Sequence, residues 1–139
     1  MTFVLDSSVA LAWILPDESN PAADVLADHL AYTAALVPSI WSLEIGNVLL
    51  VALRRGRISR DDRDRLVKEL RDLPVEVDVA STERVLVETL GLADRYDLST
   101  YDAAYLELAQ RRGLPLATLD KRLREACAAA GIGVLPEQV

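Results

Sequence analysis

The sequence lacks the features that define several large classes of protein. It holds one cysteine, Cys127, so no internal disulfide can form, and a reducing compartment fits that usage. No apolar run approaches the roughly 20 residues that a membrane-spanning helix requires. The N-terminal MTFVLDSS has no basic region before its apolar residues, so it does not resemble a signal peptide. We therefore expect a cytoplasmic protein that makes no use of a membrane.

Positive charge is also scarce. Lys and Arg number 15 against 22 Asp and Glu, which gives a formal net charge of −7, whereas proteins that bind nucleic acid usually present a basic surface. The cations are unevenly spread, because six arginines fall within RRGRISRDDRDR (54–65). That segment is either a contact for an RNA backbone or a solvated connection, and the aspartates that interrupt it favour the connection.

What the chain does contain is a regular alternation of apolar patterns. It has 139 residues, 51% of them hydrophobic, which is enough for one domain (1–139) with a buried core. Short strand-like runs are predicted at 3–6, 34–38, 74–79, 114–119 and 132–136. Helices are predicted at 7–15, 22–31, 40–55, 61–73, 81–96, 101–112 and 120–131, with Asn20, Ser59 and Ser99 or Thr100 as N-caps.

Alternating strands and helices predict an α/β fold, in which a mostly parallel sheet carries helices on both faces. In such sheets, ligand sites form at the carboxyl ends of the strands. Asp6 follows the first predicted strand and Asp120 follows the fourth. The two carboxylates are therefore expected at the same edge of the sheet.

Each of these acids also has a structural explanation. Asp6 and Asp120 stand between a strand and a helix, where aspartate is a good N-cap. Asp102 lies three residues after Ser99, at the acidic position of a capping box. On its helix, however, Asp102 shares a face with the apolar Tyr105 and Leu106, so it is expected at the rim of the core.

Glu44 is harder to explain as a cap, because it lies inside a long predicted helix. Trp41, Ile45, Val48 and Ala52 are expected to form the buried face of that helix, and Glu44 projects within the apolar arc. A buried salt bridge with an arginine is the structural alternative.

Together, four acids at one edge favour a cation site. Two carboxylates about 4 Å apart repel by roughly 4 kcal/mol at an effective dielectric near 20. Oxygen ligands without a nearby His or Cys favour Mg²⁺ or Mn²⁺ over Zn²⁺. Such a site can lower the pKa of a bound water and hold a phosphodiester for in-line attack.

Four segments carry a resemblance to the PIN-domain ribonucleases, specifically to toxins of the VapC type. These segments are VLDSSV (4–9), WSLEIGNVL (41–49), STYDAAYLELA (99–109) and LPLATLDKRL (114–123). The resemblance spans nearly the whole chain in order and spacing. It implies an α/β/α sandwich and a Mg²⁺- or Mn²⁺-dependent endoribonuclease.

The resemblance also implies residue roles and partners. The residues that match the family's acidic, metal-binding quartet are Asp6, Glu44, Asp102 and Asp120. Ser7, Asn47 and Thr118 match its supporting polar positions. The implied partners are an RNA substrate, a small antitoxin protein and a second copy of the chain in a homodimer.

Other functions are weighed against this one. A phosphoacceptor receiver domain needs an acceptor aspartate at the end of a middle strand, for which Asp78 is a poor candidate, and a haloacid-type phosphatase needs an acid where Ser8 stands. A non-catalytic protein-binding module would use the acids only as caps and ion pairs. His29 is expected at the surface and Cys127 in the core.

Overall fold

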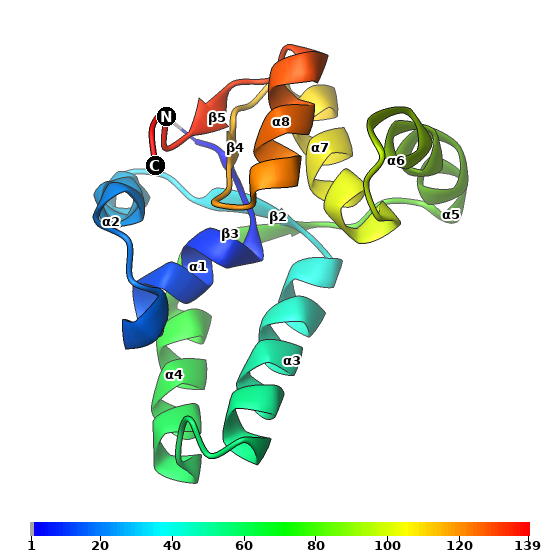
Figure 1. Cartoon of the computed structure of the whole chain (residues 1–139). Helices are drawn as coiled ribbons and strands as arrows, with labels where there is room; N and C mark the ends of the chain where they lie inside the picture. Colours follow the sequence, from blue (N-terminus) through cyan, green and yellow to red (C-terminus); the bar gives the residue numbers. More distant parts are fainter. Residues whose placement is uncertain (1) are drawn as a thin grey trace.

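The chain folds around a five-stranded sheet in which every strand is parallel to its neighbours (Figure 1). The computed structural model describes residues 2–139. The strands are β1 (Val4–Leu5), β2 (Ala35–Pro38), β3 (Val75–Asp78), β4 (Leu116–Ala117) and β5 (Val134–Leu135). All five predicted strands are therefore confirmed, although most are shorter than their apolar runs.

The strand order β3-β2-β1-β4-β5 makes β1 the centre of the sheet. Val4 pairs with Leu36 on one side and with Leu116 on the other. The chain winds outward from β1 in both directions, which places a topological switch point between β1 and β4. The carboxyl ends of these two strands, just before Asp6 and Thr118, therefore border the crevice where α/β sheets bind ligands.

Helices cover both faces of the sheet. The α-helices are α1 (Ser7–Ile14), α2 (Pro21–Ala27), α3 (Ile40–Arg54), α4 (Arg60–Asp72), α5 (Thr82–Arg84), α6 (Leu90–Tyr96), α7 (Thr100–Arg112) and α8 (Lys121–Ala130). Helices α1, α3 and α4 pack together, and α6 and α8 both pack against α7 (Figure 1). The predicted three-layer α/β/α sandwich is confirmed. No helix within residues 2–139 has the length and apolar composition needed to cross a membrane.

Local signals set most helix ends. At the start of α2, the Asn20 side chain accepts hydrogen bonds from the backbone N–H groups of Ala22 and Ala23. At the start of α4, Ser59 and Asp62 form a complete capping box. Two predicted helices differ from expectation. The helix predicted at 22–31 ends at Ala27 and continues as a 3₁₀ turn, η2 (Asp28–Ala31). Another 3₁₀ turn, η1 (Pro16–Glu18), precedes this helix. The helix predicted at 81–96 is interrupted by a π-helical turn, η3 (Val85–Thr89).

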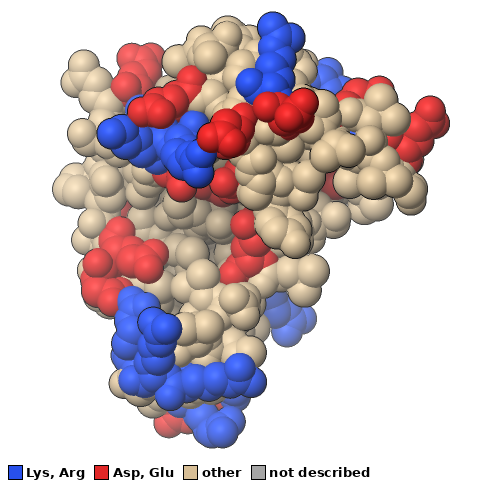
Figure 2. All heavy atoms as spheres, turned by 45° about the vertical axis from the view of Figure 1, so that its right-hand side comes forward, with Lys and Arg blue, Asp and Glu red and all other residues tan. Residues whose placement is uncertain are grey.

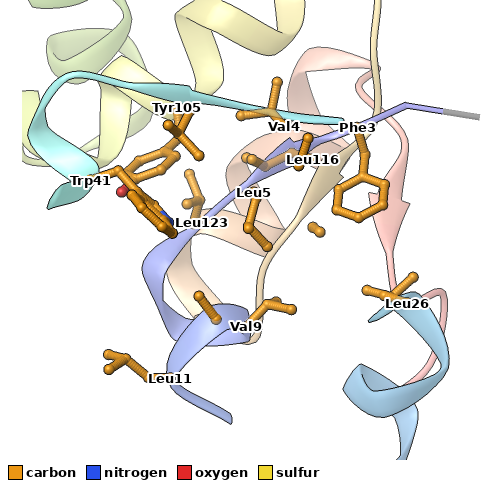
Figure 3. Packing of buried hydrophobic residues seen from close by; sticks show 14 of the residues in the cluster. Phe3, Val4, Leu5, Val9, Leu11, Leu26, Trp41, Tyr105, Leu116 and Leu123 are labelled. Atoms are coloured by element: carbon orange, nitrogen blue, oxygen red, sulfur yellow. The ribbon is translucent and has the colours of Figure 1, made fainter. Parts of the chain in front are cut away.

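The core gathers around β1, where Val4, Leu5 and the preceding Phe3 are fully buried (Figure 3). Cys127 is buried, as predicted. His29 is not a free surface residue, because it is half-buried and its ring meets Phe3 edge-on, with ring centroids 6.4 Å apart. The prediction for His29 was wrong because η2 folds this segment back onto the start of β1.

The buried face of α3 also differs from expectation. Trp41, Ile45, Leu49 and Ala52 are buried, whereas Val48 is only half-buried. The packed stripe is thus centred nearer Leu49, about 100° around the helix from Val48. Glu44 consequently lies at the edge of the buried face, where its carboxylate can reach both the core and solvent.

This correction predicts a contrast in stability between neighbouring residues. Leu49→Ala should lower the free energy of unfolding by about 2–5 kcal/mol, because it empties a closely packed site. Val48→Ala should cost clearly less, because its side chain already contacts solvent. Urea denaturation of both variants measures the difference, and equal losses would contradict the assignment of the buried face.

Candidate active site

Asp6 stands at the end of the central strand and is almost completely buried, with 4% of its surface exposed. The hydroxyls of Ser8 and Thr118 both donate to its Oδ2, each at 2.7 Å. Asp6 occupies the N-cap position of α1, but its side chain makes no capping hydrogen bond. The capping explanation is therefore wrong for Asp6, because its carboxylate is held by hydroxyls instead of by the start of the helix.

The second carboxylate oxygen of Asp6 is left available. In residues 2–139, the indole N–H of Trp41 is the one buried side-chain polar atom without a hydrogen-bond partner. Neither hydroxyl reaches Asp6 Oδ1, and Oδ1 is not among the buried atoms without a partner. One oxygen of Asp6 is thus held by two hydroxyls, and the other by neither.

Two loops are joined through the hydroxyls that hold Asp6. The backbone N–H of Leu119 donates to Ser8 Oγ at 3.0 Å, and that of Asp120 donates to Thr118 Oγ1 at 3.1 Å. Thr118 is completely buried. These contacts connect the β1–α1 turn with the β4–α8 turn and fix the orientation of Asp6.

Ser8 was missed by the sequence analysis, which chose the adjacent Ser7. In the structure, Ser7 is half-buried, and the hydroxyl that donates to Asp6 is that of Ser8. The signal for Ser8 was its spacing, because a residue two positions after Asp6 on a starting helix can turn its side chain back toward the strand end.

Glu44 reaches the same region from the first turns of α3. The hydroxyl of the buried Tyr105, on α7, donates to Glu44 Oε1. Glu44 forms no ion pair with any residue in the described part of the chain, so the predicted alternative of an arginine partner is wrong. Tyr105 was expected only as core, although a buried phenol needs an acceptor and so points to one nearby.

Asp102 lies half-buried in the first turn of α7, as predicted. Its backbone N–H donates to the N-cap Ser99 Oγ at 3.1 Å. The positive end of the helix dipole favours a carboxylate at this position. The backbone contact fixes the turn. The negative charges of Asp6 and Asp120 add to the rise in the pKa of the Asp102 side chain.

The remaining two predicted residues lie further out. Asp120 is exposed and caps α8, accepting the backbone N–H of Leu123 at 2.9 Å, so the capping explanation is correct for this residue. Its negative charge still contributes to raising the pKa of Asp6 and of Asp102. Asn47 is exposed on α3, one turn after Glu44.

Burial and neighbouring negative charge raise the pKa of each of the three inner acids. Burial raises the pKa of Asp6, with the Ser8 and Thr118 hydroxyls opposing it and the charge of Asp120 adding to it. Burial also raises the pKa of Glu44; the Tyr105 hydroxyl opposes this, and the charges of Asp6 and Asp102 add to it. For Asp102, burial raises the pKa, the charges of Asp6 and Asp120 raise it further, and Arg122 lowers it. We call Asp6, Glu44 and Asp102 the acid rim.

The acid rim fits a hydrated hard cation better than a closed metal cage. Within residues 2–139, no three Asp, Glu, His or Cys side chains meet closely enough to surround a metal ion. Mg²⁺ commonly keeps several waters and takes one or two carboxylates, and Mn²⁺ accepts the same oxygen ligands. The acid rim offers carboxylate oxygens of that kind, with no His or Cys among its members. The predicted ligand set stays a prediction.

The structure disfavours a receiver-like phosphoacceptor. Asp78 ends β3, which is an edge strand. Both of its carboxylate oxygens accept from Arg111, at 3.2 and 2.6 Å. An aspartate held by a bidentate ion pair away from the central crevice is not placed to accept a phosphoryl group.

Comparison with known proteins gives one consistent picture. Residues 3–129 match the model of the PIN domain. A relative from Pyrobaculum aerophilum named Ribonuclease VapC3 is 30% identical over 125 residues, covering 90% of this chain and 94% of its own. A crystal structure of a P. aerophilum protein has a TM-score of 0.71 at 24% identity, covering 97% of this chain and 84% of that one. A toxin-antitoxin complex from Klebsiella pneumoniae has a TM-score of 0.66 at 18% identity, covering 97% of both chains.

The acid rim predicts that this protein is destabilised by its own charge. An acid with a raised pKa in the folded state binds protons more tightly than it does when unfolded, so this contribution to stability falls as pH rises from the unfolded value through the folded one. Asp102→Asn should therefore raise the melting temperature of the metal-free protein at pH 7.5, by roughly 3–5 °C per kcal/mol of relieved repulsion.

The gain should shrink as the pH falls toward 4, where the rim takes up protons in the unsubstituted protein too. Calorimetry in EDTA measures it, with Asp28→Asn, at an exposed position, as the matched control. A gain that is independent of pH, or that the control shares, would contradict the assignment.

Proposed function

Because this chain belongs to the PIN-domain family, we propose that it is a Mg²⁺- or Mn²⁺-dependent endoribonuclease, acting in the cytoplasm as the toxin of a toxin–antitoxin pair. One observation carries this proposal. Three carboxylates from separate parts of the chain lie near the edge of the sheet, have pKa values raised by burial and by neighbouring acids, and form no ion pair in the described structure. A relative named as a ribonuclease supports the reaction class.

When bound, a divalent cation supplies charge neutralisation at a phosphate and a lowered pKa for water. The chain's own residues prepare the site for that ion. Ser8 and Thr118 hold Asp6 Oδ2 and leave Oδ1 free, and Tyr105 holds Glu44 Oε1 and leaves Oε2 free. Each carboxylate is therefore oriented before an ion arrives, which reduces the ordering cost of binding.

The outer residues have supporting roles in the proposal. Asp120 is occupied as a cap through Oδ1, so it acts on the ion at long range or through water. Asn47 and Ser7 complete the polar surroundings. No protein nucleophile is required, because water attacks the phosphodiester.

The proposal includes two protein partners, a small antitoxin and a second copy of the chain. A structural neighbour determined as a toxin-antitoxin complex supports the first. Large apolar side chains are exposed on α3, at Leu43 (71%), and on η3, at Leu86 (61%). Exposed apolar surface of this kind is typical of faces that a partner covers.

Removing one rim carboxylate should abolish cleavage without unfolding the protein. Asp102→Asn should reduce the rate of cleavage of total cellular RNA by at least about 100-fold, since changing a residue that only orients a metal ligand already costs roughly 10–100-fold. Gel analysis measures the rate, and circular dichroism checks the fold. Asp28→Asn should cleave normally. Undiminished cleavage by Asp102→Asn would refute the site.

Metal removal gives a separate test. EDTA should stop cleavage, and Mg²⁺ or Mn²⁺ should restore it. At 100 times the dissociation constant, the same ions should stabilise the unsubstituted protein by about 2.7 kcal/mol. Its melting temperature should therefore rise, and that of Asp6→Asn should rise much less. A protein without a metal-induced shift and without cleavage would instead be a non-catalytic binding module.

A further inference from the structure

Helices α3 and α4 form an arm that extends from the sheet and ends in a turn (Figure 1). We call residues 54–60 the arm tip. Gly56 adopts a left-handed conformation with φ of 72°, the capping box of Ser59 and Asp62 fixes the start of α4, and Arg57 forms an ion pair with Asp17. The arm tip is thus a structured turn with several fixed contacts.

The six arginines of residues 54–65, which include the arm tip and the start of α4, fall into two groups. Arg57, Arg63 and Arg65 each form an ion pair with an aspartate. Arg54, Arg55 and Arg60 are exposed and form no ion pair with residues 2–139. Figure 2 shows Lys and Arg side chains gathered at the end of the arm. Three arginines without an ion pair therefore lie close together in a chain whose net charge is −7.

Helix electrostatics explain only part of this arrangement. Arg54 and Arg55 lie at the carboxyl end of α3, where the helix dipole favours a cation. Arg60 is the first residue of α4, where the same dipole disfavours a cation. The helix dipole therefore does not account for the position of Arg60.

Helix α3 also sets the spacing between the arm tip and the acid rim. Glu44 lies near its start and Arg54 is its last residue. Ten residues at 1.5 Å each place the two about 15 Å apart along the axis. At 3.4 Å or more per phosphate, roughly four nucleotides of a single strand, or fewer if extended, cover that distance.

We propose that Arg54, Arg55 and Arg60 bind the phosphate backbone of a single-stranded RNA about four nucleotides or fewer from the bond held at the acid rim. The planar guanidinium groups suit phosphate oxygens. Their charge offsets the repulsion between an acidic protein and its substrate. The inference rests on the proposed ribonuclease function and adds a substrate-binding surface to it.

The test is the salt dependence of RNA binding. A labelled 12-nucleotide single-stranded RNA of mixed sequence is titrated with the full chain in EDTA, which prevents cleavage, at several salt concentrations. The variant carries Arg54→Gln, Arg55→Gln and Arg60→Gln. Each lost phosphate contact should reduce the slope of log K against log salt by about 0.7, so the triple variant should lose up to about 2.

A matched variant carries Arg71→Gln, Arg95→Gln and Arg112→Gln. These arginines are also exposed and form no ion pair within residues 2–139, and the change in net charge is the same. We expect this control to keep the slope of the unsubstituted chain. With Mg²⁺ restored, the arm-tip variant should need more RNA for half-maximal cleavage, at an unchanged maximal rate.

Three results would overturn the inference. The first is an unchanged slope in the arm-tip variant, or an equal loss in the control. The second is weaker binding at an unchanged slope, which would indicate a structural effect. The third is loss of binding to the proposed antitoxin with RNA binding intact, which would assign the arm tip to a protein partner. An unsubstituted chain that neither binds nor cleaves RNA would overturn the proposed function as well.

Discussion

The buried carboxylate of Asp6 is the constraint on which the rest of the site depends. An ionised group inside a core is costly unless it is hydrogen-bonded, and here two hydroxyls from different turns supply the bonds. Those bonds require β1 and β4 to be neighbours, which the sheet order provides. Because both hydroxyls donate to Oδ2, the fold holds one oxygen of this carboxylate and leaves Oδ1 without a hydroxyl partner.

The position of α3 separates negative charge at one end of the helix from positive charge at the other. Its first turns bring Glu44 to Tyr105 and to the other acids, and its last turn presents arginines at the arm tip. Acidic residues therefore gather where the sheet can orient them, and a group of arginines without a carboxylate partner lies at the far end of the same helix. A rigid helix between them keeps the two charges from neutralising each other. Net charge alone, at −7, conceals this separation.

Much of the fold could be predicted because its signals are local. Apolar runs located all five strands, and Asn20, Ser59 and Asp62 gave helix starts that the structure confirms. Predictions that depended on distant neighbours were less successful. The buried face of α3 was placed toward Val48 because the positions of α1 and α4 were unknown. The π-helical turn at Val85–Thr89 left no recognisable pattern in the sequence.

The sequence by itself determined which acids stand at strand ends and helix starts, because period and caps are properties of short segments. Only the tertiary structure decided what each acid does there. Asp120 is a cap and Asp6 is not, although both follow a strand, because Asp6 meets hydroxyls from Ser8 and Thr118. Glu44 is bound by Tyr105 and not by an arginine, across 61 residues of chain. Contacts of that range form only when the sheet assembles, so no local pattern could specify them.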